Sequence, residues 1–283
     1  MRPAAYFESQ VSRVADGLQH DFDDVLAVEE PLEIRLGFQQ DGKAIHKAIS
    51  ITMRTPGDDS ELAAGFLFTE GIVKEPADIK NIRPCGRPSK DKDLQNTVVV
   101  ELADGAGVDL KRLKRNFYTT SSCGVCGKSS IEALHTGAKR LPDSDLTVAS
   151  SLVHNLPNKL RDAQNVFERT GGLHASGLFG LGGDLEILRE DVGRHNALDK
   201  VIGAQFLAGN TPLADKLLLV SGRASFELVQ KALMAGIPIL AAVGAPSSLA
   251  VELAAEFNMT LAGFVRGGSF NIYAGEQRID LTR

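Results

Sequence analysis

The sequence is poor in cysteine, has no tryptophan and contains no long apolar run. Only three of its 283 residues are cysteines, which excludes a small secreted domain built on disulfides. Residues 236–245 form the most apolar stretch, far short of the roughly 20 residues of a membrane-spanning helix. The first 30 residues lack the apolar core of a signal peptide. We therefore expect a cytoplasmic protein that does not enter the membrane.

An excess of positive charge is also missing, because the formal net charge is −5. A global attraction to nucleic acid is therefore not expected, and an anionic ligand would have to be held by a local basic site. The length suffices for a large core and predicts two domains.

Strand patterns dominate the first half of the chain. Apolar residues alternate over residues 32–36, an Asp-Gly turn follows at residues 41–42, and residues 45–53 return as a second strand. A helix is predicted over residues 60–69 and further strands over residues 79–83 and 97–102. Residues 1–30 show little periodicity, so we expect this part to lack regular structure over part of its length.

The second half predicts alternating helices and short apolar strands. The predicted helices cover residues 158–169, 193–207, 226–235 and 248–257, and the predicted strands cover residues 175–181, 185–189, 216–221, 238–243, 260–265 and 270–274. This alternation is typical of a three-layer α/β domain with a largely parallel sheet. We divide the chain into a β-rich α+β part (1–117), a loop (118–127) and an α/β domain (128–283).

The loop contains Cys123 and Cys126, spaced C-x-x-C among serines and glycines. Ser129 and Glu132 form a predicted capping box, so we expect a helix to begin here and continue to about residue 141. A helix N-terminus favours nearby negative charge and lowers the pKa of a thiol. The pattern therefore predicts a reactive sulfur.

Three other uses of the pair fit the sequence less well. A structural zinc site needs four ligands, and no second C-x-x-C accompanies this one, so we expect no zinc. A zinc deaminase needs an H-x-E sequence before a P-C-x-x-C sequence, and neither is present. A thioredoxin-like pair would follow the first strand of a short βαβ domain, whereas this one comes after more than a hundred residues. Sulfur transfer through a cysteine persulfide is the chemistry that fits best.

Three predicted strands end in loops of small residues. In open α/β sheets ligands bind beyond the carboxyl ends of the strands, where glycines and arginines favour a phosphate. The candidate ligand-binding residues are Ser221, Gly222 and Arg223 in the first loop, Gly244 and Ser247 in the second, and Phe264, Val265, Arg266, Gly267, Gly268 and Ser269 in the third. His195, at the start of a predicted helix, is either a further site residue or a capping residue, and His174 poses the same question.

The longer motifs resemble those of the FdhD/NarQ family, the formate dehydrogenase accessory sulfurtransferases. The resemblance extends from about residue 28 to 275 and is carried by residues 30–32, 55–59, 65–71, 122–127, 170–175, 190–200, 221–223, 243–248 and 263–266. It implies sulfur transfer from a cysteine desulfurase to the molybdenum bis(molybdopterin guanine dinucleotide) cofactor, which is then inserted into formate dehydrogenase.

The resemblance also implies roles for single residues. Cys123 corresponds to the persulfide-bearing residue and Cys126 to its companion, while residues 264–269 correspond to the cofactor-binding segment. A fold similar to that of the cytidine deaminases and a homodimer are implied, and GDP or GMP is an expected analogue of the cofactor. Cys85 receives no role. Two alternatives stay open: a non-catalytic cofactor-binding chaperone and a thiol–disulfide oxidoreductase.

Overall fold

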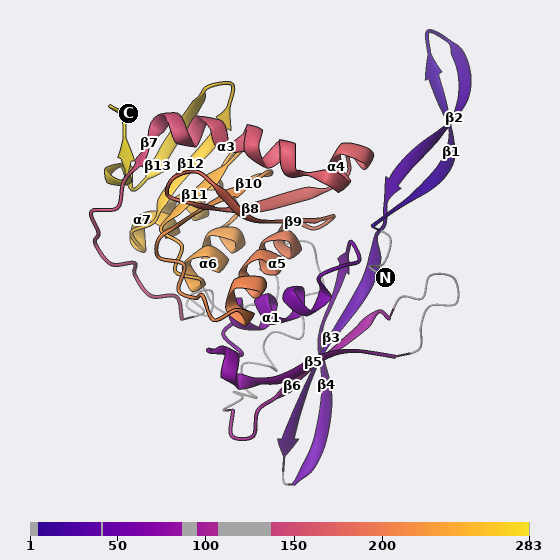
Figure 1. Cartoon of the computed structure of the whole chain (residues 1–283), viewed down its shortest axis with the longest axis vertical. Helices are drawn as coiled ribbons and strands as arrows, with labels where there is room; N and C mark the ends of the chain where they lie inside the picture. The colour runs from indigo at the N-terminus through magenta and orange to yellow at the C-terminus, as the bar shows by residue number, and fades with distance from the viewer. Residues whose placement is uncertain (1–4, 41, 87–94, 107–136, 283) are drawn as a thin grey trace.

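The structure is a computed structural model that describes residues 5–40, 42–86, 95–106 and 137–282. It has a mixed α/β architecture with a six-stranded and a four-stranded sheet (Figure 1). The described residues include no helix that is long and apolar enough to cross a membrane.

The six-stranded sheet forms the centre of the C-terminal half, in the order β13-β12-β11-β10-β8-β9. Its strands are β8 (His174–Gly180), β9 (Leu185–Asp191), β10 (Lys216–Val220), β11 (Ile239–Ala242), β12 (Thr260–Arg266) and β13 (Ser269–Ala274). Only β10, β11 and β12 run parallel to one another. The prediction of a largely parallel sheet is therefore wrong, because tight turns join β8 to β9 and β12 to β13 and force antiparallel pairing.

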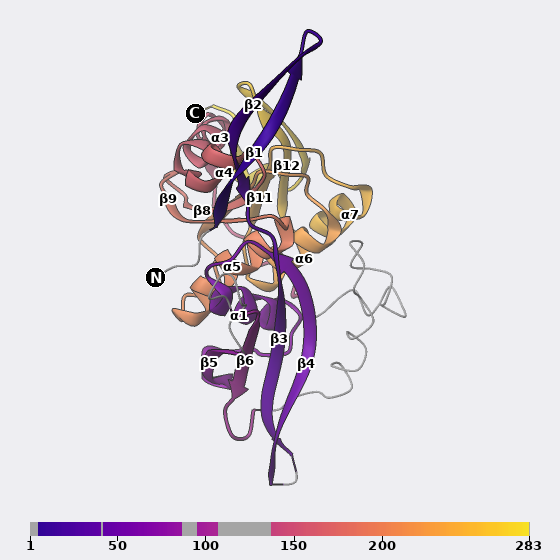
Figure 2. The ribbon, with the colours of Figure 1, turned by 90° about the vertical axis from the view of Figure 1, so that its right-hand side faces the viewer.

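Helices cover both faces of this sheet, which confirms the three layers (Figures 1 and 2). Alternate residues of β10 show the division, since Leu218 belongs to one buried cluster while Leu217 and Leu219 belong to the other. The first face carries α5 (Arg194–Leu207), α6 (Phe226–Met234) and α7 (Ser248–Glu256); the second carries α3 (Ser150–Ala163) and α4 (Asn165–Thr170). The single helix predicted over residues 158–169 is thus two helices that meet at Gln164.

The N-terminal half contributes a four-stranded sheet in the order β4-β3-β6-β5. Its strands are β3 (Glu30–Gln40), β4 (Lys43–Arg54), β5 (Ile79–Cys85) and β6 (Thr97–Leu102), and a 3-10 turn, η1 (Pro76–Asp78), precedes β5. The strands predicted in this half are confirmed. Short elements complete the chain: β7 (Val148–Ala149) pairs in parallel with β14 (Ile279–Asp280), which follows η3 (Glu276–Arg278). Residues 137–141 are not helical, and the rest of the helix predicted after the cysteine pair lies outside the described residues.

Helix α1 (Asp59–Thr69) joins the two halves by packing against α5. A Cβ atom on Gly65 would lie 1.9 Å from the carbonyl oxygen of Asp199, and one on Gly203 would lie 1.9 Å from that of Glu61. The two backbones therefore touch, which only glycine allows at these positions. One buried cluster includes Leu32 of β3 and Leu261 of β12, so the halves share a core.

Residues 6–27 form regular secondary structure. Strands β1 (Tyr6–Ala15) and β2 (Leu18–Ala27) form a hairpin that projects from the body (Figures 1 and 2). Asp16 and Gly17 both have positive φ, 52° and 76°, as a two-residue hairpin turn requires. The expectation of little regular structure here is wrong, and the Asp-Gly pair is the sequence signal that predicts the hairpin.

Candidate functional site

The three predicted ligand-binding loops lie at one edge of the six-stranded sheet, because β10, β11 and β12 are parallel and end there. Backbone hydrogen bonds link them: Gly244 N donates to Gly222 O at 3.0 Å, and Phe264 N donates to Gly244 O at 3.1 Å. A Cβ atom on Gly244 would lie 3.0 Å from Gly222 O and 3.1 Å from Arg223 Cα. The absence of a side chain at Gly244 thus allows the first two loops to approach each other closely.

The third loop, from β12 to β13, is irregular. Phe264 has a φ of 54°, and Gly267 and Gly268 also have positive φ. The pairing of β12 with β13 shifts between Gly263 and Arg266, as at a β-bulge, which re-aims the side chains that follow. The Arg266 guanidinium lies 5.5 Å from the centre of the Phe264 ring, and Arg266 to Ser269 are exposed. A left-handed phenylalanine costs on the order of 1–3 kcal/mol, and such strain is concentrated at functional sites.

Two of the predicted site residues have structural roles. Ser221 Oγ accepts a hydrogen bond from Ala175 N at 2.9 Å, and Ser247 Oγ accepts one from Ala250 N at 3.3 Å to cap α7. Arg223 is exposed beside them and adds positive charge to the edge. The arginines and the backbone of these loops are thus better candidates for ligand contacts than the serine hydroxyls.

His174 and His195 lie at this same edge. His174 begins β8, and a Cβ atom on Gly222 would lie 3.4 Å from its Nδ1. His195 is in the first turn of α5, with Nε2 3.3 Å from Ser225 Oγ and 3.9 Å from the Glu227 carboxylate. The structure therefore brings together the two histidines whose roles the sequence left open.

Both imidazoles are held in the neutral form. Burial is the main cause that lowers the pKa of His195 to about 4; the positive charges of Lys231 and Arg194 act in the same direction, and Glu227 opposes them. Burial also lowers the pKa of His174, with a further contribution from Arg194 and opposition from Asp191. At neutral pH these rings can donate and accept hydrogen bonds without carrying charge.

Arg194 is the site residue that sequence reasoning missed. Its charge acts on both histidines, and its Nε is buried without a hydrogen-bond partner among the described residues. A buried guanidinium nitrogen favours an anionic or polar ligand nearby. Its place directly before His195, at the start of the helix that follows a strand, is the signal that could have found it.

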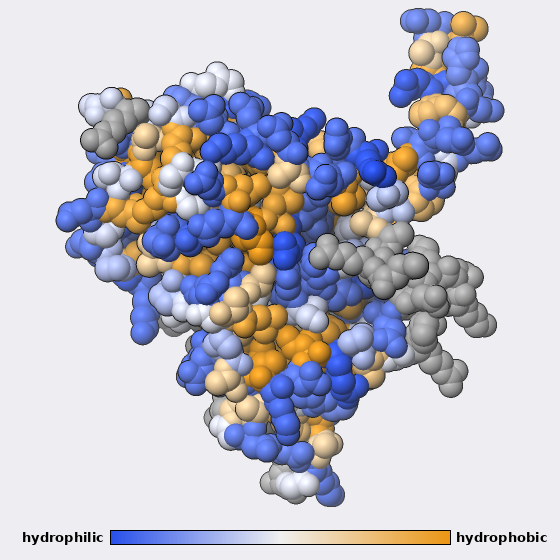
Figure 3. Space-filling view, in the orientation of Figure 1, coloured by the Kyte–Doolittle hydropathy of each residue, from blue (hydrophilic) through white to orange (hydrophobic). Residues whose placement is uncertain are grey.

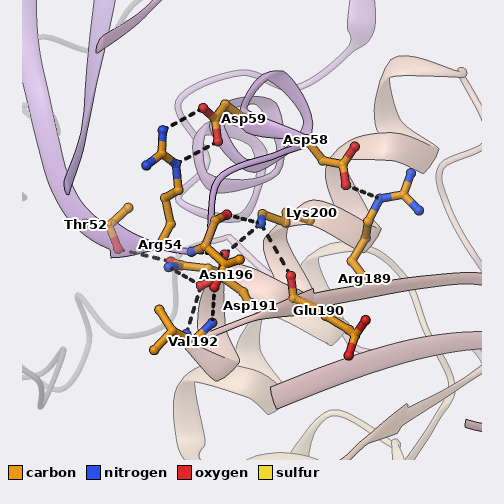
Figure 4. Close-up of polar contacts among 12 residues, drawn as sticks. Thr52, Arg54, Asp58, Asp59, Arg189, Glu190, Asp191, Val192, Asn196 and Lys200 are labelled. Atoms are coloured by element: carbon orange, nitrogen blue, oxygen red, sulfur yellow. Dashed lines mark hydrogen bonds and ion pairs between the residues drawn. The ribbon is translucent and has the colours of Figure 1, made fainter. Parts of the chain in front are cut away.

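Two of the motifs that carried the resemblance, residues 55–59 and 190–200, meet in a buried polar cluster, called here the joint (Figure 4). Its members have a structural role. Asp191 accepts hydrogen bonds from Gly193 N at 2.8 Å, from Asn196 Nδ2 at 3.0 Å and from Thr55 N at 3.2 Å. Lys200 Nζ lies 2.7 Å from the same carboxylate and donates to Thr55 O at 2.9 Å. The joint fixes the segment that leads into Arg194 and His195 against the N-terminal half.

A second buried group lies between α1, α5 and α6. Lys231 Nζ is 2.8 Å from each carboxylate oxygen of Asp199 and 2.9 Å from Thr69 Oγ1. Burial raises the pKa of Asp199, and the charge of Lys231 opposes this. Because Lys231 also lowers the pKa of His195, this group contributes to the electrostatics of the sheet edge.

Cys123 and Cys126, the predicted sulfur-bearing pair, lie outside the described residues. The described residues therefore do not define their position relative to the sheet edge. Cys85 is half-buried on β5, opposite Thr97. Within the described ranges no three His, Cys, Asp or Glu side chains are arranged to hold a metal ion. The expectation of no zinc at the cysteine pair stays a prediction.

Comparisons with known proteins match one family over nearly the whole chain. The model of the FdhD/NarQ family matches residues 27–280. The sulfur carrier protein FdhD of Streptomyces avermitilis is 52% identical over 275 residues, covering 96% of this chain and 95% of that protein. The protein of the same name from Mycobacterium tuberculosis is 50% identical, with 90% and 92% covered. A crystal structure from Desulfotalea psychrophila, assigned as a formate dehydrogenase accessory protein, has a TM-score of 0.74 at 25% identity and covers 98% of this chain and 100% of that one.

Proposed function

Because the chain belongs to the FdhD/NarQ family, we propose that it is a sulfur carrier in the maturation of formate dehydrogenase. The observation that carries this proposal is the 52% identity to a sulfur carrier protein along almost the full length. We further propose that it acts as a sulfurtransferase, that a cysteine desulfurase is the donor, and that the molybdenum bis(molybdopterin guanine dinucleotide) cofactor is the substrate that receives the sulfur. A homodimer, a cytoplasmic location and a fold similar to that of the cytidine deaminases remain predictions.

In the proposed reaction Cys123 is the acceptor. Its thiolate attacks the terminal sulfur of the desulfurase persulfide; the donor S–S bond breaks, the donor cysteine leaves as a thiolate, and a persulfide forms on Cys123. In the delivery step the Cys126 thiolate attacks Sγ of Cys123. A disulfide then forms between the two cysteines, and the outer sulfur leaves as sulfide towards the molybdenum. A direct relay of the sulfur through Cys126 is the other route.

The cofactor substrate carries phosphates and guanine, and the sheet edge has groups that suit both. Arg223 and Arg266 are exposed cations beside backbone loops, and charge-assisted hydrogen bonds to phosphate are strong. Arg194 and the neutral His174 and His195 add further hydrogen-bonding groups. We propose that this edge holds a guanine nucleotide portion of the cofactor.

Mass spectrometry tests the sulfur step. The protein is incubated with a cysteine desulfurase and L-cysteine, and a mass gain of one sulfur is mapped. We expect it on Cys123, absent in Cys123→Ala and retained in the control Cys85→Ala. Sulfur on neither loop cysteine, together with unchanged formate dehydrogenase maturation by Cys123→Ala, would favour a non-catalytic chaperone instead. Reduction of model disulfides without cofactor would favour a thiol–disulfide oxidoreductase.

Calorimetric titration with GDP and GMP tests the ligand edge separately. Arg223→Gln and Arg266→Gln should each weaken binding by about tenfold, because a hydrogen bond to a charged group contributes roughly 1.5–3 kcal/mol. Lys80→Gln, an exposed change on β5 in the other sheet, is the matched control and should bind like the wild type. Unchanged affinity in both arginine variants would place the nucleotide elsewhere.

A further inference from the structure

Glu227 is a carboxylate without a partner at the sheet edge. It lies in the first turn of α6, directly after the loop that contains Arg223. Hydrophilic residues cover much of the visible surface (blue in Figure 3), where water solvates them, but only 23% of the Glu227 side chain is exposed. None of the described residues donates a hydrogen bond to its carboxylate, and its contact with His195 Nε2 is 3.9 Å long, beyond hydrogen-bonding distance. A carboxylate largely removed from water favours donors from a ligand.

The cation best placed to pair with Glu227 is used elsewhere. Lys231 follows it by four residues on α6, the spacing at which an acid and a base pair on a helix. The Lys231 ammonium instead lies 2.8 Å from each carboxylate oxygen of Asp199 and 2.9 Å from Thr69 Oγ1. His195 does not neutralise Glu227 either, because its pKa of about 4 keeps the ring uncharged at neutral pH. The negative charge of Glu227 is therefore available to a ligand.

Two neighbours of His195 are also without a structural partner. Ser225 occupies the N-cap position of α6, but its side chain does not cap the helix; its Oγ lies 3.3 Å from His195 Nε2. Arg194, in the first turn of α5, has its Nε buried without a hydrogen-bond partner among the described residues. The start of α6 thus offers an acceptor, Glu227, and the start of α5 offers a donor, Arg194, on either side of one neutral imidazole.

The chemistry of a carboxylate selects among the nucleobases. A carboxylate only accepts hydrogen bonds, through two oxygens that lie side by side. Guanine presents two adjacent donors on one edge, N1–H and the N2 amino group. Adenine and cytosine place a single amino group beside a ring nitrogen with a lone pair, which a carboxylate repels, and uracil has one N–H between two carbonyls. Glu227 therefore suits guanine, whereas the exposed arginines of the edge suit phosphate.

We propose that Glu227 is the residue that determines base specificity at the sheet edge, by accepting hydrogen bonds from N1–H and the N2 amino group of guanine. The proposal rests on the proposed function, because it assumes that a nucleotide binds at this edge. Arg194, on the other side of His195, can donate to guanine O6, the acceptor next to N1. The base then lies at the starts of α5 and α6, and Arg223 and Arg266 are left for the phosphates.

Titration calorimetry with GDP, IDP and ADP tests the proposal, because the three ligands carry the same phosphates. IDP lacks the N2 amino group, and ADP lacks both donors. The wild type should bind GDP at least about tenfold more tightly than IDP, since one hydrogen bond to a charged group is lost. ADP should bind more weakly than IDP, because its N1 lone pair faces the carboxylate.

The variant Glu227→Gln should change the order of the three ligands. A side-chain amide has one acceptor and one donor, which match the amino group and the ring nitrogen of adenine. GDP binding should therefore weaken by at least about tenfold, while ADP binding should strengthen by a few fold. Glu252→Gln is the matched control: it removes the same charge from an exposed side chain on the neighbouring helix α7 and should keep the wild-type order.

Each other outcome overturns the proposal. A wild type that binds GDP and ADP equally, or a Glu227→Gln variant that keeps the wild-type preference, would show that Glu227 does not contact the base. Equal weakening of all three ligands in Glu227→Gln would mean that the acid only complements the positive end of α6. A wild type that binds none of the nucleotides overturns the ligand edge as well. Sulfur loading on Cys123, measured in the same samples, reports separately on the sulfur step.

Discussion

Lys200 Nζ lies 2.7 Å from a carboxylate oxygen of Asp191, and both side chains are almost completely buried. The pair belongs to the joint between β9, α5 and the segment after β4. Because Thr55 contacts both residues, the pair holds the N-terminal half against the strand that leads into Arg194 and His195.

Replacing Lys200 by methionine should destabilise the protein by about 3–5 kcal/mol, because it leaves the Asp191 carboxylate buried without its cation. Urea denaturation measures the change. Lys216→Met is the matched control: its pair with Glu186 is partly exposed, so we expect a loss of less than about 1 kcal/mol. Equal losses in the two variants would contradict this account.

Gly65→Ala should force α1 and α5 apart, because its Cβ would lie 1.9 Å from the Asp199 carbonyl oxygen. We expect a loss of at least 1–3 kcal/mol, the usual cost of overpacking. Gly182→Ala controls for the substitution itself, since the nearest atom to its Cβ is a flexible Asp184 carboxylate oxygen at 3.7 Å. Thermal unfolding of both variants gives the comparison, and a Gly65→Ala protein as stable as the wild type would show that the helices can separate freely.

The depressed pKa of His195 predicts a loss of stability in mild acid. An unfolded histidine titrates near 6.5, whereas His195 titrates at about 4 in the folded protein. Between these values the unfolded chain binds more protons, so stability falls as the pH drops from about 6.5 towards 4. The loss should be at most roughly 3 kcal/mol, and His174 should add to it in the same direction.

Urea denaturation at several pH values, compared between the wild type and His195→Gln, checks this. The variant should lose less stability than the wild type over the same pH range. A wild type and variant with parallel pH profiles would mean that His195 is not the titrating group.

Phe264→Asn separates the ring of Phe264 from its backbone conformation. Asparagine tolerates positive φ better than most residues, so stability should change little. Arg266 would lose its contact with the ring, worth about 0.5–1 kcal/mol at an exposed site, and GDP binding should weaken by a few fold. Titration calorimetry measures this, and full affinity would show that the ring does not orient the arginine for binding.

The local part of the fold was predictable from the sequence, and the long-range part was not. Strand β6 occupies the predicted residues 97–102, and α5 and α6 are within a residue or two of their predicted ends. The three ligand loops were also predicted to share an edge, because parallel strands place their carboxyl ends together. Thr55 and Asp191, in contrast, are more than a hundred residues apart, and nothing local in either motif indicates that they pair. The role of residues 190–196 as a joint therefore emerged only from the structure.

The shared core of the two halves has a consequence for synthesis on the ribosome. When the first hundred or so residues have emerged, Leu32, Leu62 and Val98 are present without the later residues that complete their buried cluster. Leu198 and Leu261, which pack in the same cluster, are made much later. The apolar residues of the early segment therefore stay exposed to water until translation is nearly finished. We expect the nascent chain to be most prone to aggregation during that interval.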